Sequence, residues 1–200
     1  MTESSTQQPL RIMLVDDDAD RASAVEASLQ ASGLEVVSII SSTSALLFQI
    51  EQHRPDVVLI DLQFPGRDIL ESLAVVNSHN PTPMVMFSQQ DDPDYIQQAV
   101  QAGVSTYLME GINPDKVKPV IDLAMAQFST FQKLRDELNT ARTQLESQTL
   151  TNRAKRLLMK HKNINEETAH RMMTKTAMDS NLKLTEVART IVSTLDSAED

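Results

Sequence analysis

Five short, almost wholly apolar runs in the first 110 residues constrain the fold of this chain more than any other feature. Each run except the last is followed by a stretch in which apolar residues recur at helical spacing, and two of these stretches are stopped by Gly33 and Gly103. Apolar strands that alternate with helices form a parallel sheet covered on both faces. The sequence therefore predicts an α/β domain with five parallel strands, at residues 12–15, 36–40, 57–62, 84–87 and 106–109.

Acidic and hydroxyl side chains follow three of these strands. Asp16 and Asp17 end the first, Asp61 lies near the end of the third, and Ser88 follows the fourth. In such sheets the functional crevice lies beyond the carboxyl ends of the strands. Carboxylate oxygens suit Mg²⁺, so Asp16, Asp17 and Asp61 are predicted metal ligands, and a carboxylate beside such an ion can accept a phosphoryl group that Ser88 can hydrogen-bond. The alternative is a site that binds metal weakly and serves only the fold.

The chain changes character after residue 111. It contains no Gly beyond Gly111 and no Pro beyond Pro119, and Asn113 with Pro114 is a typical helix start. The sequence thus predicts a helix in which five apolar residues, spaced by three and four, form a coiled-coil seam of about two heptads that pairs two chains. The alternative is a single helix packed on the sheet domain. The seam residues are Phe131, Leu134, Leu138, Ala141 and Leu145.

Residues 149–195 predict three amphipathic helices with two short polar breaks. Asn165 and Thr185 supply capping oxygens ahead of acidic residues where the second and third helices should begin. The apolar sets that define the helices are Leu150, Ala154, Leu157 and Leu158, then Ala169, Met172, Met173, Thr176 and Ala177, and finally Val187, Ala188, Ile191, Val192 and Leu195.

The three helices are basic, although the whole chain has a formal net charge of −10. Residues 151–192 carry nine basic and four acidic side chains, whereas residues 1–126 carry six basic and eighteen acidic ones. Such asymmetry is expected when one end of a protein meets a polyanion. The alternative is a solvated surface that balances the acidic half.

The basic helices lack two features that are typical of DNA-binding modules and of sheet-based RNA-binding modules. A DNA-binding helix-turn-helix often has Gly in its tight turn, and the breaks here contain none. Sheet-based RNA modules stack bases on aromatic rings, and residues 149–195 contain no Phe, Tyr or Trp. Recognition of a folded RNA by cationic and amide side chains remains. The predicted RNA-binding residues are Arg153, Lys155, Arg156, Lys160, Arg171 and Lys175.

The compartment and the absence of enzyme motifs follow from composition. The chain has no Cys, and residues 1–9 are polar, are predicted to be disordered, and lack the pattern of a signal peptide. No apolar run has the length of a membrane helix, so we expect a cytoplasmic protein without a membrane partner. The chain has no Gly-rich phosphate loop, its spacing suggests no catalytic triad, and its four His form no metal motif, which predicts that it is not an enzyme.

Residues 11 to about 128 resemble the receiver domain of bacterial response regulators. The matching segments are residues 14–18 (LVDDD), 56–61 (DVVLID) with Pro65, Ser88, and 102–107 (AGVSTY). The resemblance implies a flavodoxin-like (βα)5 fold, Asp61 as phosphoacceptor, Asp16 and Asp17 as Mg²⁺ ligands, and Tyr107 with Ser88 as the switch pair. Receivers carry Lys and then Pro three and four residues after Tyr107, where this chain has Glu110 and Gly111. Replacing attraction by repulsion there should impair phosphorylation.

Residues 150–192 resemble the ANTAR domain, an RNA-binding module of transcription antitermination regulators. The resemblance rests on residues 152–159 (NRAKRLLM), 166–169 (EETA), 177–178 (AM) and 186–188 (EVA). It implies an all-α three-helix bundle that, as a dimer, binds two small hairpins in a nascent leader transcript and so prevents a terminator from forming.

Together these domains are similar to the NasT-type regulators of nitrate and nitrite assimilation. That likeness implies a dimer controlled by a nitrate-sensor protein of the NasS type. The alternatives are a two-component regulator activated by phosphorylation of Asp61, and an adaptor whose helices bind only protein. The predicted parts are a receiver at residues 10–126, a coiled-coil linker helix at 127–148, an ANTAR domain at 149–195 and a flexible tail at 196–200.

Overall fold

The computed structural model describes residues 8–41 and 45–196, apart from the side chains at 114, 115 and 196. The chain forms two compact units, Met1–Gln132 and Lys133–Asp200. The predicted disordered segment 1–9 lies outside the described residues except for its last two, and so does the predicted tail beyond residue 196. Among the described residues, no helix combines the length and the hydropathy that a bilayer crossing requires.

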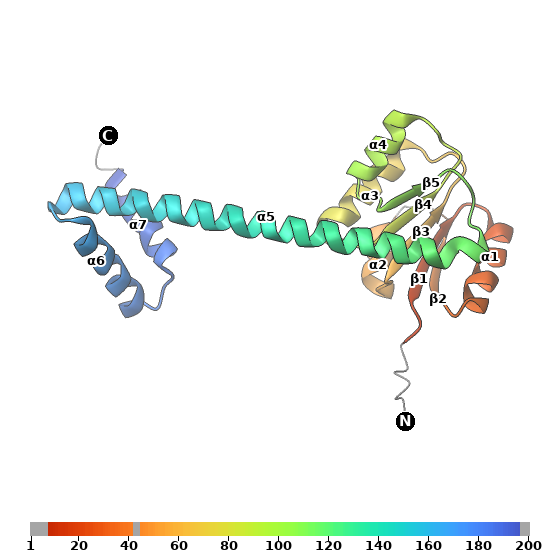
Figure 1. Ribbon diagram of the computed structural model, residues 1–200, viewed down its shortest axis with the longest axis horizontal. Helices are drawn as coiled ribbons and strands as arrows, with labels where there is room; N and C mark the ends of the chain where they lie inside the picture. Colours follow the sequence, from red (N-terminus) through yellow and green to blue (C-terminus); the bar gives the residue numbers. More distant parts are fainter. Residues whose placement is uncertain (1–7, 42–44, 197–200) are drawn as a thin grey trace, which may run out of the picture. The chain divides into compact units, whose positions relative to one another are not determined.

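The first unit is a five-stranded parallel sheet in the order β2-β1-β3-β4-β5 (Figure 1). This confirms the predicted flavodoxin-like fold class. Its strands are β1 (Arg11–Asp16), β2 (Glu35–Ile40), β3 (Val57–Asp61), β4 (Met84–Phe87) and β5 (Thr106–Leu108). Its helices are α1 (Ala19–Ala31), α2 (Leu46–His53), α3 (Arg67–His79), α4 (Pro93–Gln101) and the first part of α5 (Pro114–Lys162).

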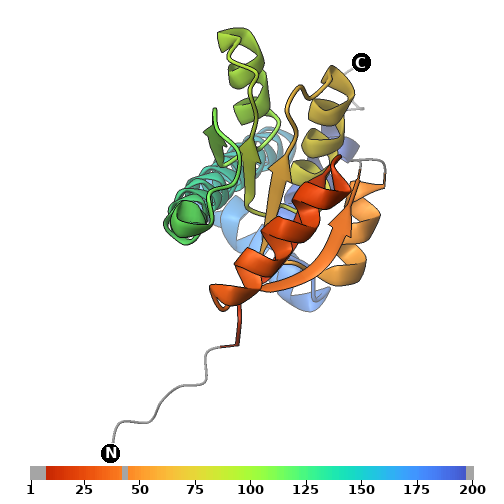
Figure 2. The ribbon, with the colours of Figure 1, turned by 90° about the vertical axis from the view of Figure 1, so that its right-hand side faces the viewer.

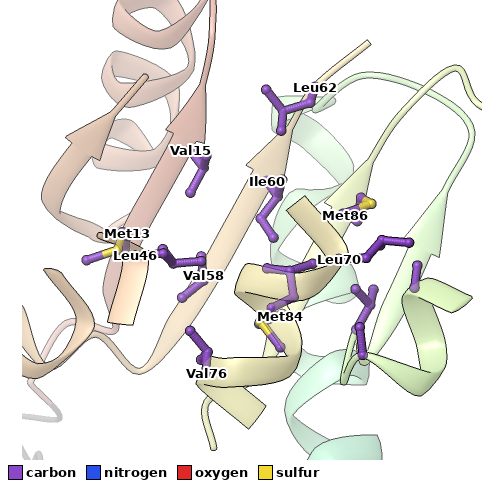
Figure 3. Packing of buried hydrophobic residues seen from close by; sticks show 14 of the residues in the cluster. Met13, Val15, Leu46, Val58, Ile60, Leu62, Leu70, Val76, Met84 and Met86 are labelled. Atoms are coloured by element: carbon purple, nitrogen blue, oxygen red, sulfur yellow. The ribbon is translucent and has the colours of Figure 1, made fainter. Parts of the chain in front are cut away.

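Helices cover both faces of the sheet because successive strand residues point to opposite sides (Figure 2). Met13 and Val15 of β1 pack with residues of α2, α3 and α4, as do Val58 and Ile60 of β3 (Figure 3). Their neighbours Ile12 and Leu14 pack on the other face, against α1 and α5. The central strands are therefore apolar between their ends: β1 is charged only at its first and last residues, Arg11 and Asp16, and β3 only at its last, Asp61.

The second unit contains α5 from Lys133 onward together with α6 (Glu166–Asp179) and α7 (Leu184–Asp196). Its core combines small and flexible side chains, which lets the three helices approach closely. The buried residues are Ala154, Leu158, Ala169, Met173, Ala177, Val187 and Ala188. This agrees with the predicted three-helix bundle.

One predicted helix cap is confirmed and the other is wrong. The Asn165 side chain accepts a hydrogen bond from the Thr168 N–H at 2.9 Å, as an N-cap should. Thr185 is not a cap, because α7 already begins at Leu184. The Glu186 carboxylate accepts a hydrogen bond from the Lys183 N–H at 2.8 Å, which satisfies a backbone group ahead of the helix without a capping hydroxyl.

The turns between α5 and α6 and between α6 and α7 contain no Gly, and in each an Asn adopts the conformation that Gly usually supplies. Asn163 and Asn181 adopt left-handed backbone angles, with φ of 52° and 53°. After α6, the Leu182 N–H donates to the Ala177 carbonyl and the Asn181 N–H donates to the Met178 carbonyl. This is the same C-terminal motif that Gly33 forms after α1, and Asn tolerates the conformation better than other non-Gly residues. The tight turns therefore exist, although the Gly signal for them is absent.

Replacing Asn181 tests this turn. Asn181→Val should destabilise the α6–α7 pair by about 1–2 kcal/mol, because a β-branched residue is strained in the left-handed region, whereas Asn181→Gly should leave it as stable or more so. Hydrogen exchange of the α6 and α7 amides in the full-length protein measures the effect. Asn139→Val, on an exposed turn of α5, is the control. Equal exchange in the Val and Gly variants would contradict the prediction.

The middle of α5 presents the predicted seam to solvent. Phe131, Leu134, Leu138 and Leu145 are 66, 57, 69 and 65 % exposed, and Ala141 is also exposed. They lie on one side of the helix because their spacing follows its 3.6-residue period. An apolar stripe of this kind on a helix is the surface that a second helix covers in a coiled coil.

Candidate functional site

The acidic crevice forms where β1 and β3 end side by side. Asp16 and Asp61 are paired in the register of these neighbouring strands, and both are buried, with 2 % and 4 % of their surface exposed. Asp17 lies in the loop after β1, and its side chain is largely exposed. The structure thus brings the three predicted carboxylates to one edge of the sheet, as the sequence indicated.

Arg21 of α1 lies among these carboxylates, and sequence analysis missed it. Its Nε and Nη2 donate to the two carboxylate oxygens of Asp16 at 3.0 and 2.6 Å. Nη2 also contacts Asp17 Oδ1 at 2.9 Å and the main-chain oxygen of Asp61 at 3.1 Å. The hydrogen bond to Asp16 is the main reason that the pKa of Arg21 lies above its usual value. Arg21 is therefore fully charged in the crevice.

Asp61 is less well satisfied than Asp16. Its Oδ2 is buried without a hydrogen-bond partner and lies 3.6 Å from Arg21 Nε. Burial raises the pKa of Asp61, and the charge of Arg21 and a hydrogen bond from the Ile112 backbone offset part of this rise. An unpartnered buried carboxylate oxygen is costly, so this side chain destabilises the folded receiver when it is ionised.

Asp61→Asn should therefore stabilise the first unit at neutral pH. Because the folded-state pKa of Asp61 is raised, its stabilising contribution is present at low pH and is lost as the pH rises through that pKa. The advantage of the Asn variant over wild type should be clear at pH 7.5 and shrink toward pH 4. Urea denaturation in EDTA at the two pH values measures it, and Asp122→Asn at an exposed position of α5 is the control. A variant less stable than wild type at pH 7.5 would refute this assignment.

The two predicted switch residues hydrogen-bond to backbone groups of the loops around the crevice. Ser88 Oγ donates to the Gln63 carbonyl at 3.1 Å and accepts from the Gln90 N–H at 3.1 Å. The Tyr107 hydroxyl donates to the Gln90 carbonyl at 2.8 Å. Ser88 and Tyr107 are thus joined through Gln90, and the hydroxyl proton of Ser88 is directed at Gln63.

The crevice has the oxygen chemistry of a Mg²⁺ site but not the space for one. Mg²⁺ requires oxygen ligands at about 2.0–2.1 Å in octahedral geometry. Here Arg21 occupies the region between Asp16, Asp17 and Asp61, and no group of three or more His, Asp or Glu in the described ranges has the arrangement to bind a metal. Glu110, in the place where receivers carry Lys, is exposed and brings a further negative charge. The residues present do not fit the ion.

The predicted RNA-binding side chains of α5 lie along one stripe. Arg153, Arg156 and Lys160 are exposed and spaced by three and four residues. At 100° per residue they fall within an arc of about 60°, on the side of the helix away from Ala154 and Leu158. Arg171 and Lys175 are exposed on α6 in the same way, opposite Ala169 and Met173, and Arg171 forms an exposed ion pair with Glu167 at 2.8 Å.

Lys155 differs from the other predicted RNA-binding residues. Its Nζ lies 2.6 Å from Glu166 Oε1, and only 16 % of its side chain is exposed. The hydrogen bond from Lys155 is the main cause that lowers the pKa of Glu166. Because Lys155 joins the end of α5 to the start of α6, its contacts are those of a residue that holds the bundle together.

Two protein families match successive parts of the chain. A family model for the response regulator receiver domain matches residues 12–122, more than half of the chain. A second model, for the ANTAR domain, matches residues 139–192. The chain is an ANTAR-domain response regulator. This response regulator therefore has a regulatory rather than a catalytic architecture.

Some relatives align with the whole response regulator, and others align only with its receiver part. The transcriptional regulatory protein PdtaR of Mycobacterium tuberculosis is 27 % identical over 199 residues, which cover 100 % of this chain and 97 % of that protein. The probable transcriptional regulatory protein NarL of the same species is 34 % identical over 125 residues, 60 % of this chain and 58 % of NarL. The alignment over both domains supports a response regulator that acts in transcription.

Solved structures match the receiver. The signal receiver domain of the M. tuberculosis response regulator NarL aligns with a TM-score of 0.52 and 30 % identity, covering 59 % of this chain and 98 % of that one. A response regulator from Thermotoga maritima aligns with a TM-score of 0.51 and 23 % identity, covering 59 % and 98 %, which supports the fold alone.

Proposed function

We propose that this response regulator binds structured leader RNA through its ANTAR domain and prevents transcription termination. The observation that carries the proposal is the exposed stripe of Arg153, Arg156 and Lys160 within the ANTAR match. Three exposed cations along one helix face can neutralise phosphates of a folded RNA backbone. The residues assigned to RNA are these three together with Arg171 and Lys175, whereas Lys155 serves mainly the bundle.

The active form in this proposal is a homodimer paired through α5. Its support is the exposed apolar stripe from Phe131 to Leu145, which precedes the basic helices on the same chain. Two ANTAR domains in one dimer match an RNA with two hairpins, because linking two binding modules raises their effective concentration. The dimer is cytoplasmic, where nascent transcripts are made.

Control passes through a protein partner rather than through phosphorylation of Asp61. Glu110 supplies no positive charge for a phosphoryl group, and Arg21 already occupies the space beside Asp61. We further propose that the protein is an antiterminator of nitrate and nitrite assimilation genes and that a nitrate-sensor protein of the NasS type controls it. This assignment rests on resemblance to the NasT-type regulators alone.

Incubation with Mg²⁺ and acetyl phosphate, followed by measurement of the intact mass, distinguishes regulation by a protein partner from regulation by phosphorylation of Asp61. We expect no stoichiometric adduct on the full-length protein. An adduct that Asp61→Asn abolishes would favour phosphorylation at Asp61 as the signal.

Single-round transcription of a leader template tests the output. Adding the protein should increase read-through past the terminator, and adding a purified NasS-type sensor should reverse this unless nitrate is present. Binding to the sensor without any effect on read-through or any retention of hairpin RNA would instead favour a protein-only adaptor.

A further inference from the structure

Arg21 is the third residue of α1, at the end of the helix where a cation is least favourable. The N-terminus of a helix carries partial positive charge, so an Arg there is repelled unless nearby anions compensate. Asp18 caps this terminus by accepting hydrogen bonds from the Asp20 and Arg21 N–H groups at 3.0 Å. Helix side chains lean toward the N-terminus, and this directs the Arg21 side chain at the crevice.

The guanidinium of Arg21 contacts all three acidic residues of the crevice. It forms a two-pronged ion pair with Asp16, contacts the Asp17 carboxylate, and lies near the Asp61 carboxylate with Nε at 3.6 Å from Oδ2. A planar guanidinium suits such an arrangement, because its donors reach several oxygens in one plane. Arg21 thus hydrogen-bonds the carboxylates of Asp16 and Asp17 and supplies the positive charge nearest to the Asp61 carboxylate.

This ion-pair network is not an ordinary surface salt bridge. The side chain of Asp16 is fully buried, that of Asp61 is 6 % exposed, and that of Arg21 is 25 % exposed. Carboxylates removed from water require a countercharge, and removing the partner leaves an uncompensated buried charge. In divalent-ion sites the metal supplies this positive charge; here the chain supplies it.

We propose that Arg21 is a built-in cation that takes the place of Mg²⁺ in the acidic crevice of this receiver. The receiver then folds without a divalent ion, and the switch residues Ser88 and Tyr107 keep their positions. The inference concerns the first unit alone and does not depend on RNA binding by the second. Without the guanidinium, the carboxylates of Asp16, Asp17 and Asp61 would lack their countercharge, and Asp61 Oδ2 is in addition buried without a hydrogen-bond partner.

Removing the guanidinium should therefore create metal binding. Full-length wild type and Arg21→Met are titrated with Mn²⁺, and the free ion is followed by electron paramagnetic resonance. Met retains a long side chain but has no charge. We expect Arg21→Met to bind one Mn²⁺ with an affinity at least about tenfold higher than that of wild type. Arg67→Met, at an exposed position of α3, is the control and should behave as wild type.

Thermal unfolding in EDTA and in Mg²⁺ gives a second measurement with the same proteins. Wild type and Arg67→Met should have the same midpoint in both buffers, whereas Arg21→Met should melt lower in EDTA and recover when Mg²⁺ is added. If Arg21→Met is too unstable in EDTA, recovery of its fold by Mg²⁺ is the expected result. The proposal is overturned if wild type binds Mn²⁺ as tightly as Arg21→Met, if Mg²⁺ stabilises wild type, or if Mg²⁺ fails to restore Arg21→Met.

Discussion

Replacing Arg153, Arg156 and Lys160 together by Ala is expected to weaken binding of the full-length protein to a two-hairpin leader RNA by about 100-fold near physiological salt, if each side chain contacts one phosphate. The physical reason is counterion release: each phosphate that a cation neutralises frees bound counterions, which favours the complex. The slope of log affinity against log salt should become shallower by about 2 to 3 units for the same reason.

Fluorescence anisotropy with labelled RNA at several salt concentrations measures both quantities. The matched control removes three exposed cations from the receiver, at Arg67, Lys116 and Lys118, so that the net charge of the chain changes equally. If the control loses as much affinity as the ANTAR variant, the attraction is a general charge effect and not a binding surface. Unchanged affinity in the ANTAR variant would exclude the stripe on α5 as that surface.

Lys155 is absent from this set because of a contact that the sequence alone does not reveal. Lys155 and Arg156 are neighbours with the same charge, and periodicity leaves Lys155 at the border between the core face and the solvent face of α5. Its partner Glu166 follows the turn between α5 and α6, and in this turn Asn163 adopts a left-handed backbone conformation. Only the folded bundle brings these two side chains together, so the sequence could not indicate that Lys155 is paired with Glu166 and mostly buried.

The receiver fold, in contrast, was predictable almost in full. Leu14 and Met13 face opposite sides of the sheet and both are buried, so β1 is apolar from residue 12 to residue 15, which identifies a sheet covered on both faces. Because parallel strands end at one edge, Asp16 and Asp61 could be placed together from strand ends alone.

Arg21 could not be placed in the crevice by the same argument. The available signals were its position five residues after Asp16 and the helix start that Asp18 caps. These indicate where the backbone of Arg21 lies but not where a long, flexible side chain turns. A prediction of Mg²⁺ ligands from carboxylates needs a further test, which is whether a nearby cation already satisfies them.

Replacing Leu134 and Leu138 together by Lys is expected to raise the dimer dissociation constant by about 10,000-fold or more. Both side chains are exposed on the single chain, so in a dimer they would bury most of their surface against the partner helix. A dimer loses four buried leucines, at about 1.5 kcal/mol or more each, and four Lys charges then face each other across the seam. A seam of about two heptads is too short to keep two chains paired at low concentration once these contacts are lost.

Sedimentation velocity over a range of protein concentrations measures the dissociation constant directly. Thr140→Lys with Thr143→Lys adds the same charge to the opposite side of α5 and should leave the dimer intact, because those positions lie outside the stripe. The Leu variant should also bind a two-hairpin RNA more weakly than wild type but bind a single hairpin equally, since only the linkage between two ANTAR domains is lost. A variant that stays dimeric would place the pairing surface elsewhere, whereas equal loss on both RNAs would show that the substitutions act on the bundle itself.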